Sequence, residues 1–160
     1  MIKFFKVLKK MIRKATKNDF DSIDSIGTDS YPDNYYEGVE SFRSKMIAYP
    51  DGCFVCQPRD DVIGYIISFP YILFKPYPIN CYYKNIEHPT CYYIHDLCVS
   101  KKHRGNGYAS ALVHEVLKIK SSPKALMSVL GSNKFWERFG FKPYKTEMYY
   151  GMNATYMILP

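Results

Sequence analysis

The sequence His103-Arg104-Gly105-Asn106-Gly107-Tyr108-Ala109-Ser110 decides the fold. It joins the apolar segment Cys91–Val99, which has strand character, to the amphipathic segment Gly107–Lys120, which has helical periodicity. Glycines let the backbone approach a ligand closely, and the first N–H groups of a helix point toward an anion in the preceding turn. Arg104 adds positive charge, as do Lys101 and Lys102 beside it. The pattern predicts a loop that holds pyrophosphate at a helix N-terminus.

Two other kinds of glycine-rich phosphate loop are excluded by the residues that follow. A P-loop ends in Gly-Lys-Ser/Thr, whereas Tyr108 and Ala109 follow Gly107 here. A dinucleotide fingerprint requires glycine where Ser110 stands. It also requires an acidic residue about 20 positions later, where this sequence is apolar.

Three motifs resemble those of the GNAT acetyltransferase superfamily. Arg104-x-x-Gly107-x-Ala109 resembles the family signature R/Q-x-x-G-x-G/A, and Phe135–Phe141 resembles the late helix and turn, F-[YW]-x-x-x-G-F. Leu97–Val99 resembles the strand end that binds the pantetheine arm. The resemblance covers nearly the whole chain from Met11, and it implies an enzyme that uses acetyl-coenzyme A (acetyl-CoA) and no metal. The cofactor-binding residues that it implies are Leu97, Cys98, Val99, Arg104, Gly105, Asn106, Gly107, Tyr108, Ala109, Ser110 and Trp136.

The rest of the chain predicts the α/β (α+β) architecture of the GNAT fold. We expect a mixed, mostly antiparallel sheet of six to seven strands, flanked by about four helices, in the order β-α-α-β-β-β-α-β-α-β-β. The expected strands are Met11–Ala15, Cys53–Gln57, Val62–Phe69, Cys91–Val99, Lys124–Leu130 and a pair from Phe141 onward. The expected helices are Thr16–Gly27, Gly38–Ala48, Gly107–Lys120 and Ser132–Phe139. Residues 1–10 are predicted to be an N-terminal extension or an extra strand, and residues 11–160 a single domain.

The composition limits the partners. The chain has 160 residues, of which 47% are apolar and 23% charged, and this is typical of a folded domain. Its net charge of +7 favours anionic partners, but no helix gathers base-reading side chains, so nucleic acid is disfavoured. No stretch is long enough for a membrane span. Five cysteines and no signal peptide predict a reducing cytoplasm, and Cys53-x-x-Cys56 lacks the second pair of a zinc site. The oligomeric state stays open, with a homodimer as one candidate.

His95 is the candidate general base. Acetyl transfer to an amine requires removal of an amine proton, and histidine titrates near neutral pH. Strand alternation predicts that Tyr93, His95 and Leu97 share one face, while Asp96 and Cys98 lie on the other. Cys98 would then face away from the base, and it lacks an activating partner, so direct attack in a ternary complex is favoured over an acyl-cysteine. A backbone N–H of the Leu97–Val99 strand end is the candidate oxyanion donor; an ordinary core or surface histidine is the alternative interpretation of His95.

A narrower resemblance points to arylalkylamine N-acetyltransferases. Ile94–Val99 is similar to the H-x-L-A-V strand of that group, and Gly64–Pro70 to its G-Y-x-x-x-x-P strand. The matching histidine takes part in proton removal there, so the resemblance assigns that role to His95. Two residues depart from the pattern. A second histidine of some members is Tyr93 here, and the tyrosine that often protonates the leaving thiolate falls at Trp136. The proton donor is therefore another tyrosine or water, or coenzyme A leaves as the thiolate.

The 16 tyrosines and 10 phenylalanines predict an aromatic acceptor site. The predicted substrate-binding residues are Tyr35, Tyr36, Phe69, Tyr71 and Tyr93. Aromatic walls suit a small amine, either an arylalkylamine or a polyamine, whose second charge the acidic residues Asp29, Asp33, Glu37 and Glu40 would hold. A protein or peptide acetyltransferase is the first alternative, and a wide open groove instead of an aromatic tunnel would indicate it. A non-catalytic acyl-CoA-binding domain is the second, suggested by Trp136 at the position of the usual proton-donating tyrosine. A separate alternative is that the aromatic residues simply pack the long loop down.

Overall fold

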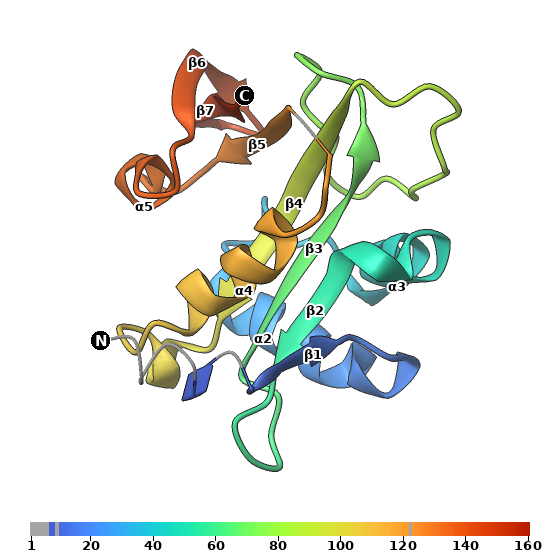
Figure 1. Cartoon of the computed structure of the whole chain (residues 1–160), viewed down its shortest axis with the longest axis vertical. Helices are drawn as coiled ribbons and strands as arrows, with labels where there is room; N and C mark the ends of the chain where they lie inside the picture. The colour runs from blue at the N-terminus through green and yellow to red at the C-terminus, as the bar shows by residue number, and fades with distance from the viewer. Residues whose placement is uncertain (1–6, 9, 122) are drawn as a thin grey trace.

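The sheet runs through the whole molecule. The computed structural model describes residues 7, 8, 10–121 and 123–160. Within them, seven strands form one sheet in the order β1-β2-β3-β4-β5-β7-β6 (Figure 1). The strands are β1 Ile12–Lys14, β2 Cys53–Cys56, β3 Gly64–Tyr71, β4 Cys91–Val99, β5 Lys124–Ser128, β6 Lys142–Tyr149 and β7 Met152–Leu159.

The last of these, β7 (Met152–Leu159), lies between β5 and β6, so the C-terminal hairpin is inserted beside β5. The β4–β5 pair is parallel and the other neighbouring pairs are antiparallel.

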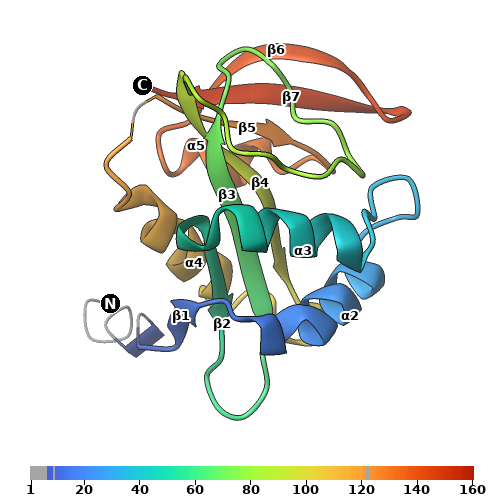
Figure 2. The ribbon, with the colours of Figure 1, turned by 90° about the vertical axis from the view of Figure 1, so that its right-hand side faces the viewer.

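Among the described residues, two helices cover each face of the sheet. They are α2 Phe20–Ser30, α3 Val39–Ala48, α4 Tyr108–Leu117 and α5 Asn133–Glu137, with short 3-10 turns at Lys17–Asp19, Pro50–Gly52 and Lys101–His103. Figure 2 shows α3 crossing in front of β3 with α2 below it, while α4 lies behind the sheet. The observed element order and the mixed, mostly antiparallel sheet confirm the predicted fold class.

Each face of the sheet has its own apolar core. The core under α2 and α3 includes Ile23, Phe42, Tyr65, Phe69 and Tyr93. The core under α4 and α5 includes Ile66, Leu112, Val116, Trp136 and Phe141. The long segment 72–90 has no helix or strand, but buried aromatic side chains anchor it to the first core, among them Tyr77 and Tyr83.

The first helix begins as the sequence predicts but ends later. Thr16 and Asp19 form the expected capping box, with the Thr16 N–H donating to Asp19 Oδ2 at 2.7 Å. The predicted end at Gly27 is wrong, because α2 continues to Ser30. Gly27 is a packing position: a Cβ there would lie 3.1 Å from the Tyr65 hydroxyl oxygen. The glycine therefore permits close approach of helix and sheet.

A β-bulge changes which residues of β4 share a face. Ile67 pairs with Asp96, whereas the next residue, Ser68, pairs with Ile94, so His95 is the additional residue on β4. Beyond the bulge, Cys98 belongs to the same core as Tyr93, and Leu97 packs with the opposite core. The predicted sharing of one face by Tyr93, His95 and Leu97 is therefore wrong, because simple alternation assumes an uninterrupted ladder.

The N-terminal segment is described only in part. Residues 1–6 and 9, on which the prediction of an extension or extra strand falls, lie outside the described residues. Leu8 is buried, and its side chain approaches the backbone of Gly107. In the part of the chain that the structure describes, no helix has the length and apolar character needed to cross a membrane.

Candidate active site

A passage of neighbouring cavities follows the edge of β4, and adjacent cavities share lining residues. It consists of a loop cavity of about 400 Å³ beside Gly105, a cleft of about 360 Å³ beside Leu97, and a small inner cavity of about 50 Å³ beside His95. The loop cavity and the cleft share walls formed by Val99 and Arg104. A smaller gap, lined by both Leu97 and His95, connects the cleft with the inner cavity.

The cleft exists because β4 and β5 separate. Their pairing covers Tyr92–Ile94 and Lys124–Leu126, and the two strands then diverge (Figure 1). Beyond this point, the edge of β4 that would have faced β5 lines the cleft at Leu97–Val99, and Trp136 of α5 forms part of the cleft wall. Trp136 is 7% exposed, so its indole is an apolar wall. A parallel pair that opens in this way leaves backbone groups free to bind an extended ligand.

The loop cavity has the features of an anion site. Gly105 and Gly107 have φ angles of 78° and 81°, a conformation that glycine adopts without strain. A Cβ on Gly105 would meet nothing within 4 Å, so the space above it is open. Gly107 is the N-cap of α4, whose first N–H groups carry partial positive charge. Arg104 donates from Nε to the Val99 carbonyl oxygen at 3.0 Å, which holds the side chain between loop and cleft.

The predicted cofactor residues gather along this passage with one exception. Those that line the loop cavity are Val99, Arg104, Gly105, Gly107, Tyr108, Ala109 and Ser110, and those added by the cleft are Leu97, Cys98 and Trp136. The Asn106 amide instead donates to the carbonyl oxygens of His103 and Arg104, at 3.1 and 3.2 Å. Asn106 therefore stabilises the shape of the loop. The open glycine turn, the helix N-terminus and the basic side chain fit a pyrophosphate group, and the apolar cleft fits a pantetheine arm.

His95 lies between the inner cavity and the gap, in contact with a buried carboxylate. Its Nε2 lies 2.6 Å from Oε2 of Glu37, and both side chains are at most 5% exposed. The rings of Tyr77 and Phe69 lie 5.0 and 5.7 Å from the imidazole, centroid to centroid, and restrict its orientation. Burial alone would raise the pKa of Glu37, but the nearby charges and hydrogen bonds of His95 and Lys45 outweigh burial and lower the pKa to about 2.

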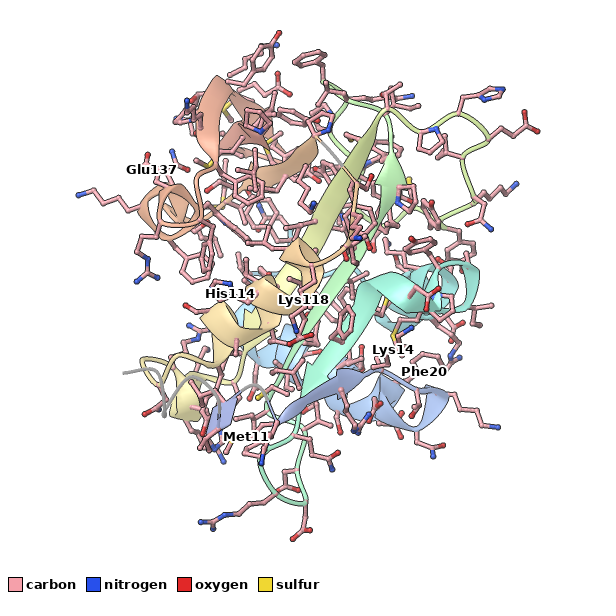
Figure 3. All side chains as sticks on the ribbon, viewed as in Figure 1. Met11, Lys14, Phe20, His114, Lys118 and Glu137 are labelled. Atoms are coloured by element: carbon pink, nitrogen blue, oxygen red, sulfur yellow. The ribbon has the colours of Figure 1, made fainter. Side chains whose placement is uncertain are left out.

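The other histidines lie elsewhere. His114 is on the outer face of α4 (Figure 3), where its ring meets Phe139 edge-on at 5.4 Å. His103 lines the loop cavity, and His88 is exposed on the 72–90 segment. Among the four histidines, His95 is therefore the one that lines the inner cavity.

A second carboxyl group lies beside His95. Asp96 is 7% exposed, and it accepts hydrogen bonds from the hydroxyls of Tyr31 at 2.6 Å and Tyr65 at 2.9 Å. Burial raises the pKa of Asp96 and also raises that of Tyr31. Tyr31 lines the cleft, the gap and the inner cavity, so it lies where all three meet.

Two of the five predicted substrate residues line the inner cavity. Tyr35 and Tyr93 form parts of its wall. Tyr36 turns back to α2, where its hydroxyl donates to Asp24. Phe69 and Tyr71 lie inside the core below His95, so the structure does not bring them to the wall of the cavity. The remaining wall includes Ile79, Met127, Val129 and Tyr149.

The geometry supports no role for a cysteine as nucleophile in this site. All five are free, and burial raises the pKa of Cys98 to about 11 and of Cys53 to about 12. Cys98 lies on the same side of the sheet as Tyr93, contrary to the prediction, because of the bulge. A buried thiol of raised pKa is a poor nucleophile. Among the described residues, no group of three His, Cys, Asp or Glu side chains is arranged to hold a metal ion.

Sequence reasoning missed the partners of His95. Glu37 precedes the helix-capping Gly38, whose φ is 75°, and it stands four and eight residues before Ser41 and Lys45. This spacing puts polar side chains on the buried face of α3, between Phe42 and Met46. A lysine in the apolar stripe of a helix is the signal that would have found the cluster, because lysine is almost never fully buried without a partner.

Comparison with known families identifies the class of protein. The model of the acetyltransferase (GNAT) family matches residues 10–141, which is more than half of the chain. The chain belongs to this family. The membership supports acyl transfer from acetyl-CoA, and the fit of the loop cavity and cleft agrees with it. A search among curated proteins found no match.

Several solved structures share this fold. Ard1 from Thermoplasma volcanium is 19% identical with a TM-score of 0.74, over 93% of this chain and 97% of that one. Naa50 from Arabidopsis thaliana, in complex with the bisubstrate analogue CoA-Ac-MVNAL, is 19% identical with a TM-score of 0.68, over 93% and 97%. The loading GNATL domain of CurA from Lyngbya majuscula is 12% identical with a TM-score of 0.78, over 92% and 96%. At these identities the likeness shows the fold alone, and it does not support the arylalkylamine subgroup.

Proposed function

We propose that the protein transfers the acetyl group of acetyl-CoA directly to the primary amine of a small molecule with an apolar body, with His95 as general base. The observation that carries the proposal is the passage that leads from the glycine loop along β4 to His95. A donor bound along the cleft and an acceptor in the inner cavity would meet beside His95. Family membership supplies the reaction class.

The chain's own groups divide the proton transfers. His95 takes a proton from the amine as the nitrogen attacks the thioester carbon. The unpaired edge of β4 at Leu97–Val99 offers a backbone N–H to the carbonyl oxygen, where negative charge develops. When the carbon–sulfur bond breaks, its electron pair goes to sulfur. Tyr31, at the junction of cleft and inner cavity, then gives its hydroxyl proton to the sulfur by turning from Asp96. His95 returns its proton to solvent and Tyr31 regains one.

The wall of the inner cavity favours an acceptor without a second charge. The Tyr35 and Tyr149 hydroxyls donate to the carbonyl oxygens of Tyr149 and Tyr77, at 3.1 and 2.5 Å. The Tyr93 hydroxyl accepts from the Tyr77 N–H at 3.3 Å. The acceptor body therefore meets ring faces together with the apolar side chains Ile79, Met127 and Val129.

The acidic residues near the site already have partners, which disfavours a polyamine. Glu37 binds His95 and Lys45, and Glu40 pairs with Arg43 on the surface of α3. Asp96 accepts from two tyrosine hydroxyls. A second ammonium group would enter an aromatic cavity without a free carboxylate, and burial of an unpaired charge is costly.

The closed outer wall favours a small amine over a peptide. Asn34 in the α2–α3 connection donates to the Tyr150 carbonyl oxygen at 2.7 Å, and Tyr35 bonds to Tyr149 beside it. Figure 2 shows this connection next to the β6–β7 turn. The bonds join two walls of the inner cavity, whereas an extended peptide requires an open groove between them. The analogue bound to Naa50 contains a peptide, so a peptide acceptor remains the principal alternative.

An amine panel tests the proposal. The protein is incubated with acetyl-CoA and tryptamine, phenethylamine, spermidine, lysine or a mixed peptide set, and products are separated and identified by mass. We expect turnover on an arylalkyl monoamine, with kcat/KM for spermidine lower by at least about tenfold, which corresponds to about 1.4 kcal/mol. Acetylation of peptides alone would contradict the small-amine acceptor. Bound acetyl-CoA without turnover on any amine would contradict catalysis.

A further inference from the structure

A fully buried lysine lies behind the Glu37–His95 pair. Lys45 of α3 is 0% exposed, and its Nζ donates to Ser41 Oγ at 2.6 Å, to the Cys81 carbonyl oxygen at 3.1 Å and to Glu37 Oε1 at 3.2 Å. It also lies 5.3 Å from the centre of the Tyr77 ring. Burial of an ammonium group is costly, and apolar side chains in place of both members of a buried ion pair are often at least as stable. The lysine therefore calls for a functional explanation.

The two oxygens of Glu37 have different partners. Oε1 accepts from Lys45, from Ser41 Oγ at 3.2 Å and from the Asn80 N–H at 2.9 Å. Asn80 has a φ of 60°, an uncommon conformation for a residue other than glycine. Oε2 is left for His95 Nε2 alone, at 2.6 Å. Three donors thus hold the carboxylate in one orientation, with its other oxygen directed at the imidazole.

This arrangement determines which nitrogen of His95 carries a proton. An ionised carboxylate can only accept hydrogen bonds, so the imidazole must donate to it through Nε2–H. In a neutral imidazole, Nδ1 is then the nitrogen with a free lone pair. Nδ1 makes no hydrogen bond to the described residues, and His95 lines both the gap and the inner cavity.

We propose that Lys45 is a positioning residue for acetyl transfer: through Glu37 it fixes the Nε2–H tautomer of His95, which makes Nδ1 the atom that accepts the amine proton. The kinetic consequence rests on the proposed function. The tautomer is a property of the free protein, so the two can fail separately.

The test compares Lys45→Met with the double variant Glu37→Gln/Lys45→Met. The single variant leaves the buried Glu37 carboxylate without its lysine partner and will lose thermal stability. The double variant removes both charges and will regain most of that stability, so it keeps the test informative if Lys45→Met does not fold. A structural role for Lys45 predicts that activity returns with stability. A positioning role predicts that stability returns without activity.

The first measurement is the tautomer of His95. The ring nitrogens are observed by NMR in 15N-histidine-labelled protein at pH 8, and the His95 signals are assigned by their loss in His95→Gln. We expect Nε2 protonated and Nδ1 unprotonated in the wild type, and a mixture of the two tautomers in the double variant. An unchanged Nε2–H tautomer in the double variant would overturn the proposal, whatever the enzyme acetylates.

The second measurement is steady-state kinetics with an accepted amine from the panel. We expect kcat of the double variant to fall by at least about tenfold, at the lower end of general-base contributions, with KM for acetyl-CoA within about twofold of the wild type. A wild-type kcat in a stable double variant would reduce Lys45 to a structural residue. Absence of turnover in the wild type would count against the proposed function, while the NMR result would still decide the tautomer.

Discussion

The proposed base, His95, and the proposed acid, Tyr31, each contact a buried carboxyl group. His95 contacts Glu37, whose pKa of about 2 keeps the carboxylate ionised at any pH at which the protein would act. Tyr31 donates a hydrogen bond to Asp96, whose pKa is raised by burial. His95 and Asp96 are neighbours in sequence, yet the bulge in β4 lets both side chains reach the same side of the sheet. In the proposed mechanism, these two adjacent residues serve two separate proton transfers.

We expect Tyr31→Phe to lower kcat by about 10- to 100-fold, because the leaving sulfur would lose its proton donor. KM for acetyl-CoA should stay within about twofold, since the ring remains in the wall of the cleft. Tyr65→Phe is the matched control: it removes the other hydroxyl bonded to Asp96, but Tyr65 is 0% exposed and lines none of the cavities described above. Steady-state kinetics of both variants checks the prediction. Equal losses in the two would show that the hydroxyls only support Asp96.

The sequence predicts individual site residues better than the side chains that contact them. His95 was found because a strand motif carries it, and Trp136 because it stands in a late-helix motif. Glu37 and Lys45 belong to no such motif, and they contact His95 only after α3 packs on the sheet. Tyr31 was one tyrosine among 16, and sequence alone offered no reason to choose it. Contacts between residues about 60 positions apart, such as Glu37 and His95, depend on tertiary packing.

The loop before α4 is the element proposed to bind the phosphate groups of the donor substrate. Gly105 and Gly107 both have positive φ, and the first turn of α4 follows at once. The open space above Gly105 is where a phosphate would approach the backbone. A glycine is therefore needed at position 105 for two reasons: the backbone has a positive φ, and a phosphate needs the space that a side chain would fill.

Gly105→Ala should weaken acetyl-CoA binding by at least about fivefold, because a methyl group would occupy this space and the left-handed conformation costs roughly 1 kcal/mol. Gly151→Ala is a matched control with the same conformation. Its φ is 82°, compared with 78° at Gly105, and a Cβ there also meets nothing within 4 Å. Both variants should lose similar stability, and only Gly105→Ala should lose affinity in calorimetric titration with acetyl-CoA. Equal affinities would mean that phosphate does not approach Gly105.

Elements were predicted more reliably than their ends. β4 has the predicted bounds, because its apolar run is long and lies between polar segments. β3 was predicted at Val62–Phe69 and is found at Gly64–Tyr71. The strand continues through Pro70, which still pairs with Tyr92 of β4. The bulge at His95 could not be predicted, because it arises from the pairing of two strands and leaves no mark in one of them.

The whole molecule separates donor and acceptor across one sheet. The loop cavity lies beside α4, whereas the inner cavity lies among residues from the α2–α3 connection, β4 and the β6–β7 hairpin. The passage between them crosses the sheet where β4 and β5 part. In the proposed mechanism, this arrangement lets an acetyl group move directly from one substrate to the other, without a covalent intermediate on the protein.

The order of elements, and with it the family, could be predicted from the sequence, because the glycine loop and the late helix motif stand on consecutive elements. The closed outer wall of the inner cavity could not be predicted from the sequence. It depends on hydrogen bonds such as Asn34 to Tyr150, which join segments more than 100 residues apart. The sequence therefore leaves the choice between a small amine and a peptide open, and the closed wall is what supports the proposed small amine.

The central claim is that His95 removes the amine proton inside a complex of protein, acetyl-CoA and amine. The most direct test is the rate of acetylated amine formation by wild type and His95→Ala, at saturating concentrations of both substrates. The account predicts a rate at least about 100-fold lower in the variant, as for loss of a general base, with acetyl-CoA affinity within about twofold. An undiminished rate in His95→Ala would contradict it and place the base elsewhere.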